Sequence, residues 1–387
     1  MKIFHLSDLH IGVKLHNQDL AEEQGYVFAQ IIEQIKERQP DVIVIAGDIY
    51  DKAVPTAEAV KLFDAFMENI YRAAGDGKIM LISGNHDSAQ RIDCFRWALE
   101  KDQMYMVGLP PLTKEERIEK VVVWDDYGEV NFYLLPYVRP ALVRNVLEVK
   151  ENQALSYDEA LHLLIEREQI DTTKRNVLVS HQFYLPKECD PESIERTDSE
   201  VQSVGNVDVV YADAISQFDY AALGHIHKPM TVGLNHLRYC GTPFAYSVSE
   251  AGQEKGMLEI TLGKKGEPVQ IEKIVLKPKH QVRVIKGTLE EVLQQSCEDF
   301  VSVVVTGETE FESFDLNEKL GNAFPRLLEI RRERMVRDAE LEELTERFMA
   351  GDLEPYELIC EFISGELDEE EQTILKEVIN ELEGVGE

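Results

Sequence analysis

The sequence of 387 residues has few cysteines and no long hydrophobic run. No stretch approaches the roughly 18 apolar residues that a membrane span needs. The first residues enter a strand pattern without the layout of a signal peptide. The five cysteines are scattered and contain no Cys-x-x-Cys pair, which argues against a zinc–thiolate site and for a reducing compartment. We therefore expect a cytoplasmic protein without a membrane segment.

Basic residues are also scarce. The chain has 40 Lys and Arg against 73 Asp and Glu, a net charge of −33, which is unusual for a protein that handles nucleic acid. Residues 338–387 hold 18 acidic and 2 basic residues, so a net charge of −16 lies in this last segment. A bound pair of divalent cations would offset part of the remaining charge locally. A nucleic-acid substrate would require such metals, local basic patches or a partner chain.

What the sequence does contain is a series of apolar runs that end in Asp, Asn or His. These runs occupy residues 2–9, 41–46, 79–82, 176–179 and 220–223. Amphipathic helices are expected at 18–38 and 55–74, between the first three runs. Strands that alternate with helices predict a parallel sheet with right-handed crossovers. In such sheets, sites form beyond the carboxyl ends of the strands.

The polar residues at these ends form the candidate site: Asp8, His10, Asp48, Asn85, His86, His181, His225 and His227. Asp8 and His10 are two residues apart, as are the last two histidines, so on an extended backbone each pair points the same way. Oxygen and imidazole ligands without thiolate suit Mn, Fe, Zn or Mg. The set is too large for one ion, and two ions sharing a carboxylate are the usual arrangement for phosphoester hydrolysis.

The triplet Asn85-His86-Asp87 offers a metal ligand, a proton donor and an orienting carboxylate. Taken singly, a strand-end histidine or a Gly-Asp pair is more often structural. The recurrence at five strand ends is what supports a metal site. Asp51 is interpreted as a turn residue and not a ligand. Arg91 follows the triplet and either holds phosphate or simply covers a helix surface.

The rest of the chain predicts further elements. A strand pair is expected over 119–139, a helix over 157–169, a loop over the site at 186–206 and β structure over 239–262. Past residue 278 the pattern predicts a small α+β domain without metal-type residues, followed by acidic amphipathic helices. We therefore expect three domains, at 1–277, 278–337 and 338–387.

Five sequence blocks, in order, resemble the pattern of calcineurin-like metallophosphoesterases. They are Asp8-x-His10, Gly47-Asp48-x-x-Asp51, Gly84-Asn85-His86-Asp87, His181 and Gly224-His225-x-His227. Other segments resemble the bacterial SbcD family of nuclease subunits, relatives of the Mre nucleases. These are Leu135-Pro136-Tyr137, Gly205-Asn206-Val207, Tyr239-Cys240-Gly241-Thr242-Pro243 leading to Ser247-Val248-Ser249-Glu250, and the small domain. The resemblance covers nearly the whole chain and is weakest after residue 338.

The resemblance implies an α/β fold, a sandwich of mixed β-sheets flanked by helices, with an α+β capping domain and a C-terminal helical segment. It implies two Mn²⁺ ions, with Mg²⁺, Fe²⁺ or Zn²⁺ as alternatives. The first ion would be bound by Asp8, His10 and His227, and the second by Asn85, His181 and His225, with Asp48 bridging. His86 would act near the leaving group, steadied by Asp87.

The resemblance also implies partners: double-stranded DNA, a coiled-coil ATPase of the SbcC type, and a second copy of the chain within a heterotetramer. The acidic segment 338–383 would grip the ATPase, and the alternative is a solvated helical tail.

Three functions remain open from sequence. The first is a Mn-dependent DNA exonuclease and endonuclease that acts as one subunit of a complex in DNA repair, recombination and replication. The second is a phosphodiesterase or phosphatase on small nucleotides or phosphoproteins, which would not require the residues after 278. The third is a scaffold for the ATPase, against which the intact ligand set argues.

Overall fold

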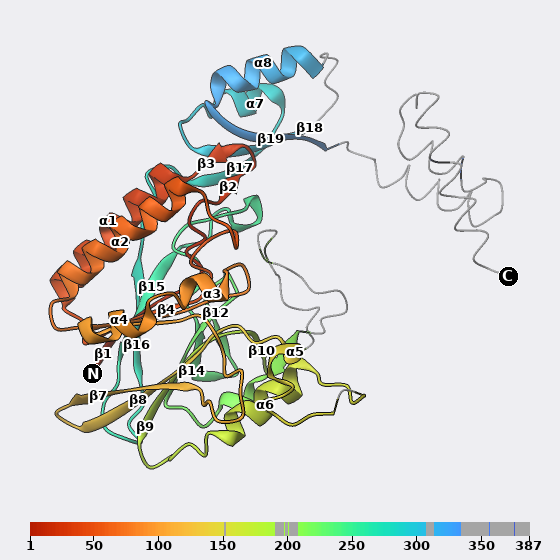
Figure 1. Cartoon of the computed structure of the whole chain (residues 1–387). Helices are drawn as coiled ribbons and strands as arrows, with labels where there is room; N and C mark the ends of the chain where they lie inside the picture. The colour runs from red at the N-terminus through yellow and green to blue at the C-terminus, as the bar shows by residue number, and fades with distance from the viewer. Residues whose placement is uncertain are drawn as a thin grey trace.

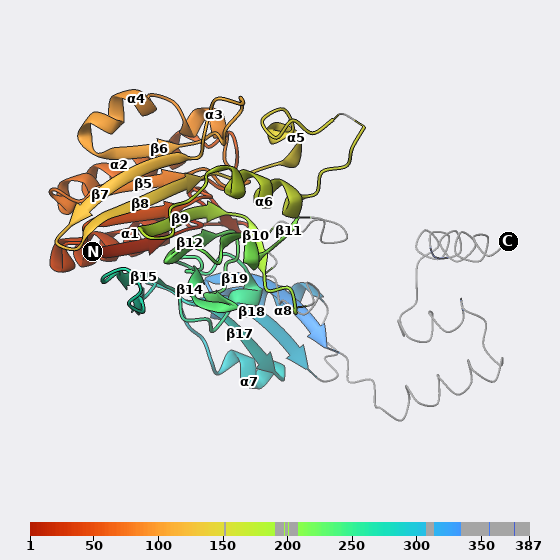
Figure 2. The same cartoon turned by 90° about the horizontal axis from the view of Figure 1, so that it is seen from below.

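The computed structural model describes residues 1–150, 152–189, 208–306 and 313–333, together with Thr197, Glu200, Tyr356 and Leu375. Within these residues, two sheets of six strands each lie face to face, and helices cover their outer faces (Figure 1). A third, three-stranded sheet lies beside them (Figure 2). This arrangement confirms the predicted α/β sandwich with a small additional domain.

The first sheet has the strand order β16-β15-β1-β4-β5-β6. Its strands are β1 (Lys2–Leu6), β4 (Val42–Ala46), β5 (Lys78–Ile82), β6 (Met104–Val107), β15 (Gly256–Thr261) and β16 (Gln270–Val275). Strands β1, β4 and β5 are parallel, as predicted. Strand β6, which was not predicted, is also parallel, whereas β15 and β16 are antiparallel additions. Helices α1 (Ala21–Arg38) and α2 (Ala57–Ala74) cover the outer face.

The predicted starts and ends of two early elements were wrong by a few residues. The first strand ends at Leu6 because the backbone turns at Asp8. Helix α1 begins at Ala21, not at residue 18, because the preceding residues pair in a short hairpin. That hairpin consists of β2 (Lys14–Leu15) and β3 (Gln18–Asp19).

The second sheet has the order β13-β14-β12-β9-β8-β7. Its strands are β7 (Glu119–Asp125), β8 (Gly128–Leu135), β9 (Arg175–His181), β12 (Tyr220–Gly224), β13 (Met230–Val232) and β14 (Leu234–Tyr239). The antiparallel pair β7–β8 confirms the predicted strand pair. Helix α6 (Tyr157–Arg167) begins at a capping box and packs through Leu161 and Leu164 on the outer face.

The core between the sheets consists of alternate residues from both. Val42, Val44 and Ala46 of β4 face inward and contact the cluster that contains Val177 and Val179 of β9. The intervening residues of β4 face the helices instead. Because β-strand side chains alternate between faces, one apolar run serves both layers. The packing brings the carboxyl ends of strands from the two sheets to one edge of the sandwich.

Short elements complete this domain: α3 (Ala89–Ile92), α4 (Arg96–Leu99), η1 (Glu100–Asp102), α5 (Pro140–Val143), β10 (Phe183–Leu185), β11 (Val209–Tyr211), η4 (Ala212–Ile215) and η5 (Val248–Glu250). The β structure expected over 239–262 is present at Tyr239 and in β15, whereas residues 240–255 between them form no strand. After β14 the chain turns at Gly241, whose φ is +76°, and Pro243 offers no amide proton for a ladder. The chain re-enters a sheet only at β15.

The small domain contains β17 (Val282–Gly287), α7 (Leu289–Leu293), β18 (Phe300–Thr306), α8 (Ser313–Ala323) and β19 (Arg326–Glu333). The prediction of an α+β domain was wrong in class, because the three strands are parallel and alternate with helices, which is an α/β arrangement. Phe300 of β18 belongs to the same buried cluster as residues of α1, and its ring packs edge-on against Phe244. This contact joins the small domain to the first domain. The expected helices of 338–383 lie outside the described residues, apart from Tyr356 and Leu375. No helix in the described part is long and apolar enough to cross a membrane.

Candidate active site

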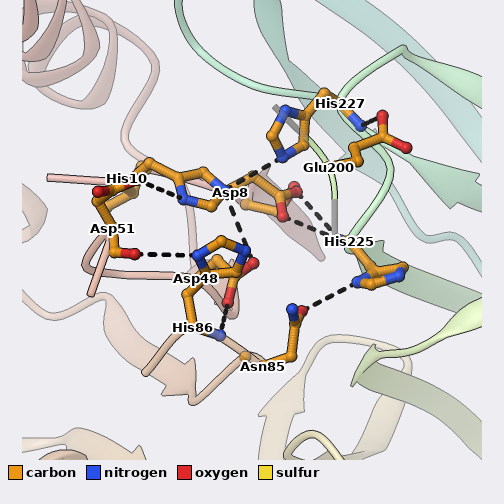
Figure 3. A network of polar contacts seen from close by, with 12 residues as sticks. Asp8, His10, Asp48, Asp51, Asn85, His86, Glu200, His225 and His227 are labelled. Carbon is orange, nitrogen blue, oxygen red and sulfur yellow. Dashed lines mark hydrogen bonds and ion pairs between the residues drawn. The ribbon is translucent and has the colours of Figure 1, made fainter. Parts of the chain in front are cut away.

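The candidate site lies where the ends of β1, β4 and β5 meet the ends of β9 and β12 (Figure 3). The parallel pairing of β12 with β9 places Gly224 beside His181, so the loop that carries His225 and His227 begins next to His181. All eight strand-end residues predicted from sequence lie in this one region.

The backbone at the site turns sharply. The φ angles are +51° at Asp8, +42° at His10, +50° at Asp48 and +107° at His225. The expectation of extended Asp-x-His and His-x-His segments was therefore wrong, although the side chains still converge. The loops after β1 and β4 hold each other in these conformations, because the amide of Asp8 donates to the carbonyl of Gly47 at 3.0 Å, and the amide of His10 to that of Asp48 at 3.0 Å.

Two sets of donor atoms surround the Asp48 carboxylate. On one side, Nε2 of His10 lies 3.6 Å from Asp48 Oδ2 and 3.1 Å from Nε2 of His227. On the other side, Nε2 of His181 lies 3.2 Å from Asp48 Oδ2. Asn85 Oδ1 lies 3.0 Å from both His181 Nε2 and His225 Nδ1. Asp48 therefore stands between the two sets, while Asp8 lies close enough to contribute to both.

A glycine allows Asp48 to approach the loop after β5. A Cβ atom on Gly84 would lie 2.1 Å from Asp48 Oδ1 and 2.4 Å from its backbone nitrogen. This space lets Asp48 Oδ1 accept a hydrogen bond of 2.9 Å from the amide of His86. The Gly-Asp and Gly-Asn-His-Asp blocks thus fit together through the one residue type that leaves room.

His86 is oriented differently from the sequence interpretation. Its Nδ1 lies 2.9 Å from the backbone carbonyl of Asp51. The carboxylate of Asp87, which was expected to steady His86, instead accepts hydrogen bonds from the amides of Ile49, Tyr50 and Gly84. Asp87 therefore fastens the loops after β4 and β5 together, because a short carboxylate beside three amides satisfies all of them at once.

The donor set fits divalent cations. Within the described residues, three groups of Asp and His side chains have ligand atoms within 4.8 Å of one another: Asp8, His10 and His227; His10, Asp48 and His86; and Asp8, Asp48 and His181. They include imidazole and carboxylate donors, and no cysteine is among them. All but His86 are buried, so the charges lie where water solvates them poorly.

The ionisation of the metal-free site follows from this burial. Burial raises the pKa of the Asp8 carboxyl to about 6. Burial disfavours the charged form of Asp48, yet its ion pair with His181 holds the Asp48 pKa well below its usual range. Burial likewise opposes protonation of His181, but the same pair overrides it and raises the His181 pKa to about 9. In the metal-free site, His181 therefore carries a proton that a bound cation would displace.

Three acidic residues around the site were given no role in it from sequence: Asp51 was interpreted as a turn residue, and Glu200 and Glu250 were not considered as site residues. The Asp51 carboxylate lies 3.9 Å from His10 Nδ1, Glu250 lies 3.7 Å from His227 Nδ1, and Glu200 accepts the His227 amide at 2.9 Å. For Glu250 the only sequence signal was its place in the Ser-Val-Ser-Glu segment. Glu200 is one of two described residues of the predicted 186–206 loop beyond residue 189. Arg91 is exposed on α3, and its role as a phosphate contact stays a prediction.

Comparison with known families agrees with this geometry. Residues 1–229 match the family described as Calcineurin-like phosphoesterase. Residues 278–366 match the Type 5 capsule protein repressor C-terminal domain. A likeness to the solved calcineurin-like phosphoesterase YfkN from Bacillus subtilis covers 76% of this chain and 94% of that one, with 13% identity and a TM-score of 0.38. The family match over residues 1–229, together with the cluster of Asp and His side chains, defines a calcineurin-like, metal-dependent phosphodiester hydrolase.

Two curated relatives narrow the family, and both are SbcD subunits of the nuclease SbcCD. The chain is 32% identical over 300 residues to the protein from Staphylococcus epidermidis, which is 76% of this chain and 75% of the relative. It is 32% identical over 303 residues to the protein from Staphylococcus saprophyticus, which is 77% and 75%. The chain belongs to this SbcD family of metal-dependent nuclease subunits, as its sequence blocks predicted.

Proposed function

We propose that the chain is the Mn²⁺-dependent subunit that cleaves double-stranded DNA at ends and hairpins, as exonuclease and endonuclease, together with an SbcC-type ATPase in DNA repair, recombination and replication. The observation that carries the proposal is the position of Asp48 between two sets of donor atoms. Two ions that share one carboxylate suit in-line cleavage of a phosphodiester. The relatives are named as part of the nuclease SbcCD, which supports the choice of substrate and partner.

The proposed ligand assignment is the one that the family resemblance implies, and the distances among these side chains support it. Asp8, His10 and His227 would hold one ion, and Asn85, His181 and His225 the second, with Asp48 bridging. The two cations would supply positive charge to the phosphate oxygens and the attacking water. Mn²⁺ suits this mixed oxygen and imidazole set, which also admits Mg²⁺, Fe²⁺ or Zn²⁺.

His86 would assist departure of the leaving group. Nδ1 lies 2.9 Å from the Asp51 carbonyl oxygen, which can only accept a hydrogen bond. The neutral ring therefore carries its proton on Nδ1, and Nε2 is the nitrogen that remains for the reaction. When water attacks phosphorus and the bond to the leaving sugar oxygen breaks, Nε2 of the protonated ring would give its proton to that oxygen. Asp87 would keep His86 in place indirectly, through the loop amides that it binds.

A cleft of about 440 Å³ offers a path for the DNA. It lies beside the site, between the nuclease domain and β19, and is lined by residues that include Lys14, His16, Asp51 and Arg331. Arg331 is held by Glu329 at 2.6 Å. Lys14 and Arg331 share the lining of this cleft with Asp51 and Glu329, so the local positive charge for the DNA backbone would come mainly from the two cations. A cap formed by the domain at 278–337 is part of the proposal, and the contribution of Glu329 and Arg331 of β19 to this cleft supports it.

The ATPase would bind the acidic segment 338–387. Its net charge of −16 and amphipathic pattern favour a docking segment for a basic or apolar partner surface. The division of the chain at 1–277, 278–337 and 338–387 is part of this proposal.

The chain would also pair with a second copy. A groove of about 490 Å³ runs between α2 and β6, lined mainly by apolar residues such as Phe63, Met67 and Met106. Nearby, Phe95 is 72% exposed and Trp97 of α4 is 71% exposed. Large exposed aromatics around an apolar groove are typical of interfaces, and two copies could share this face around a twofold axis.

The first experiment is digestion of a labelled linear DNA duplex with Mn²⁺, with and without the ATPase, by the wild type and Asp48→Ala. A small phosphodiester serves as the second substrate. Metal-dependent DNA cleavage by the wild type alone supports the nuclease. Turnover of only the small ester supports a small-molecule phosphodiesterase instead, and no DNA cleavage even with the ATPase contradicts the proposal.

A further inference from the structure

We propose that Glu250 and Lys255 form a buried clamp that positions His227 as a metal ligand, so that one ion of the pair depends on them and the other does not. The inference rests on the two-ion site proposed above and adds positioning residues to it. Neither residue belongs to the ligand blocks recognised from sequence.

The backbone of His227 is held on both sides. Its amide donates to Glu200 Oε1 at 2.9 Å. Its carbonyl accepts hydrogen bonds from the amide of Thr242 at 3.1 Å and from Nζ of Lys255 at 3.1 Å. Glu200, Thr242 and Lys255, from three separate segments of the chain, therefore fix the backbone of His227.

The ring of His227 is held as well. Nδ1 lies 3.7 Å from Glu250 Oε1, while Nε2 faces Nε2 of His10 at 3.1 Å. A carboxylate behind Nδ1 favours the proton on that nitrogen and leaves the lone pair on Nε2. Carboxylates placed behind histidine ligands in this way orient the ring and increase its basicity.

Glu250 is itself fixed in place. Its side chain is fully buried, and Nζ of Lys255 lies 2.6 Å from Oε2. Oε2 also accepts from Thr242 Oγ1 at 3.1 Å, and Oε1 accepts from the hydroxyl of Ser247 at 3.0 Å. A buried ion pair is weak evidence for stability, since apolar side chains of similar size often serve as well. The contacts of the pair with both the ring and the carbonyl of His227 instead indicate a role in placing that residue.

The clamp acts on one half of the site. His181, in the other half, directs Nδ1 to the backbone carbonyl of Ala46 at 2.8 Å, with no side chain as intermediary. Loss of the Glu250 charge should therefore weaken the ion held by Asp8, His10 and His227, and leave the ion held by Asn85, His181 and His225 in place.

The test is titration of metal-free protein with Mn²⁺ by calorimetry, with electron paramagnetic resonance of the bound Mn²⁺. The variant is Glu250→Gln, which keeps the shape and removes the charge. We expect two ions in the wild type, and in the variant one unchanged ion and one bound about 10–100-fold more weakly. The resonance should change from that of a coupled pair to that of a single ion. Glu254→Gln is the matched control, because its side chain is 65% exposed and pairs with Lys273.

Thr242→Val is a milder second variant, for use if Glu250→Gln does not fold. It removes one hydrogen bond from Glu250 and should weaken the same ion by a smaller factor. Equal weakening of both ions, or two unchanged ions in Glu250→Gln, would overturn the clamp while leaving the two-ion site intact. A wild type that binds no Mn²⁺ would overturn the two-ion site itself, and the clamp with it.

Discussion

The Nε2 atoms of His10 and His227 lie 3.1 Å apart, although 217 residues separate them in the chain. Two imidazole nitrogens this close require a proton or a cation between or beside them, because their lone pairs repel. Behind each ring stands a carboxylate, Asp51 for His10 and Glu250 for His227. The fold thus directs two nitrogen donors toward one point, which suits a shared cation.

Metal binding should release protons below about pH 9. The His181 pKa is raised to about 9 by its pair with Asp48, so the metal-free protein carries that proton at neutral pH. This pair stabilises the metal-free fold fully below the unfolded-state pKa of about 6.5, and the contribution is lost as the pH rises through about 9. Because Mn²⁺ needs a neutral imidazole, its affinity should rise with pH by about tenfold per unit for each proton released. Calorimetry in two buffers of different ionisation enthalpy measures the release, and identical binding enthalpies would contradict it.

Replacement of His86 should separate binding from cleavage. We expect His86→Ala to bind Mn²⁺ like the wild type and to cleave DNA about 10²–10⁴-fold more slowly, the usual effect of a general acid. Single-turnover digestion measures the rate, and metal titration checks the site. His162→Ala, on the surface helix α6, should retain the wild-type rate. An active His86→Ala enzyme would remove this residue from the mechanism.

A methyl group at Gly84 should damage the site through Asp48. The added Cβ of Gly84→Ala would lie 2.1 Å from Asp48 Oδ1, so either the carboxylate or the loop must move. We expect the free energy of unfolding to fall by about 1–3 kcal/mol. We expect Mn²⁺ binding to weaken as well, because Asp48 is the proposed bridging ligand. In Gly25→Ala, on α1, the new Cβ meets no atom within 4 Å, and the helix should gain about 0.5–1 kcal/mol. Urea unfolding measures the free energy of unfolding of both variants. Equal changes in Gly84→Ala and Gly25→Ala would refute the prediction.

Removal of residues 338–387 should leave a folded nuclease domain. The metal ligands and the cores of both described domains lie before residue 338. We expect the shortened chain to bind Mn²⁺ with wild-type affinity and to lose the coiled-coil ATPase in size-exclusion chromatography of the mixed proteins. Retention of the complex would show that the ATPase binds elsewhere.

The groove between α2 and β6 should mediate pairing of two copies. We expect Trp97→Asp to convert a dimer into a monomer in sedimentation velocity, because a charge at an apolar interface is costly to bury. Trp124→Asp is the matched control, since Trp124 is 70% exposed on β7, which contributes no residue to the groove, whereas α4, which carries Trp97, contributes Leu99. Equal sedimentation of the wild type and Trp97→Asp would contradict the proposed interface.

The sequence by itself determined the five strands that lead into the site, β1, β4, β5, β9 and β12, and the polar residues at their ends. An apolar run such as residues 42–46 forms a strand because both of its faces are buried, one against the second sheet and one against helices. The alternation with helices determined that β1, β4 and β5 are parallel, which in turn placed Asp8, Asp48 and Asn85 at one edge.

Only the tertiary structure decided how the two halves of the site meet and what orients them. The packing of the two sheets brings His181 and His225 to Asn85 across separations of 96 and 140 residues. The carbonyl of Asp51 behind His86, and Glu250 behind His227, are likewise positioned by the folded chain. Periodicity and strand-end motifs reflect only local burial and turning. Contacts between distant loops produce no local sequence pattern, because they form only when the two sheets pack together.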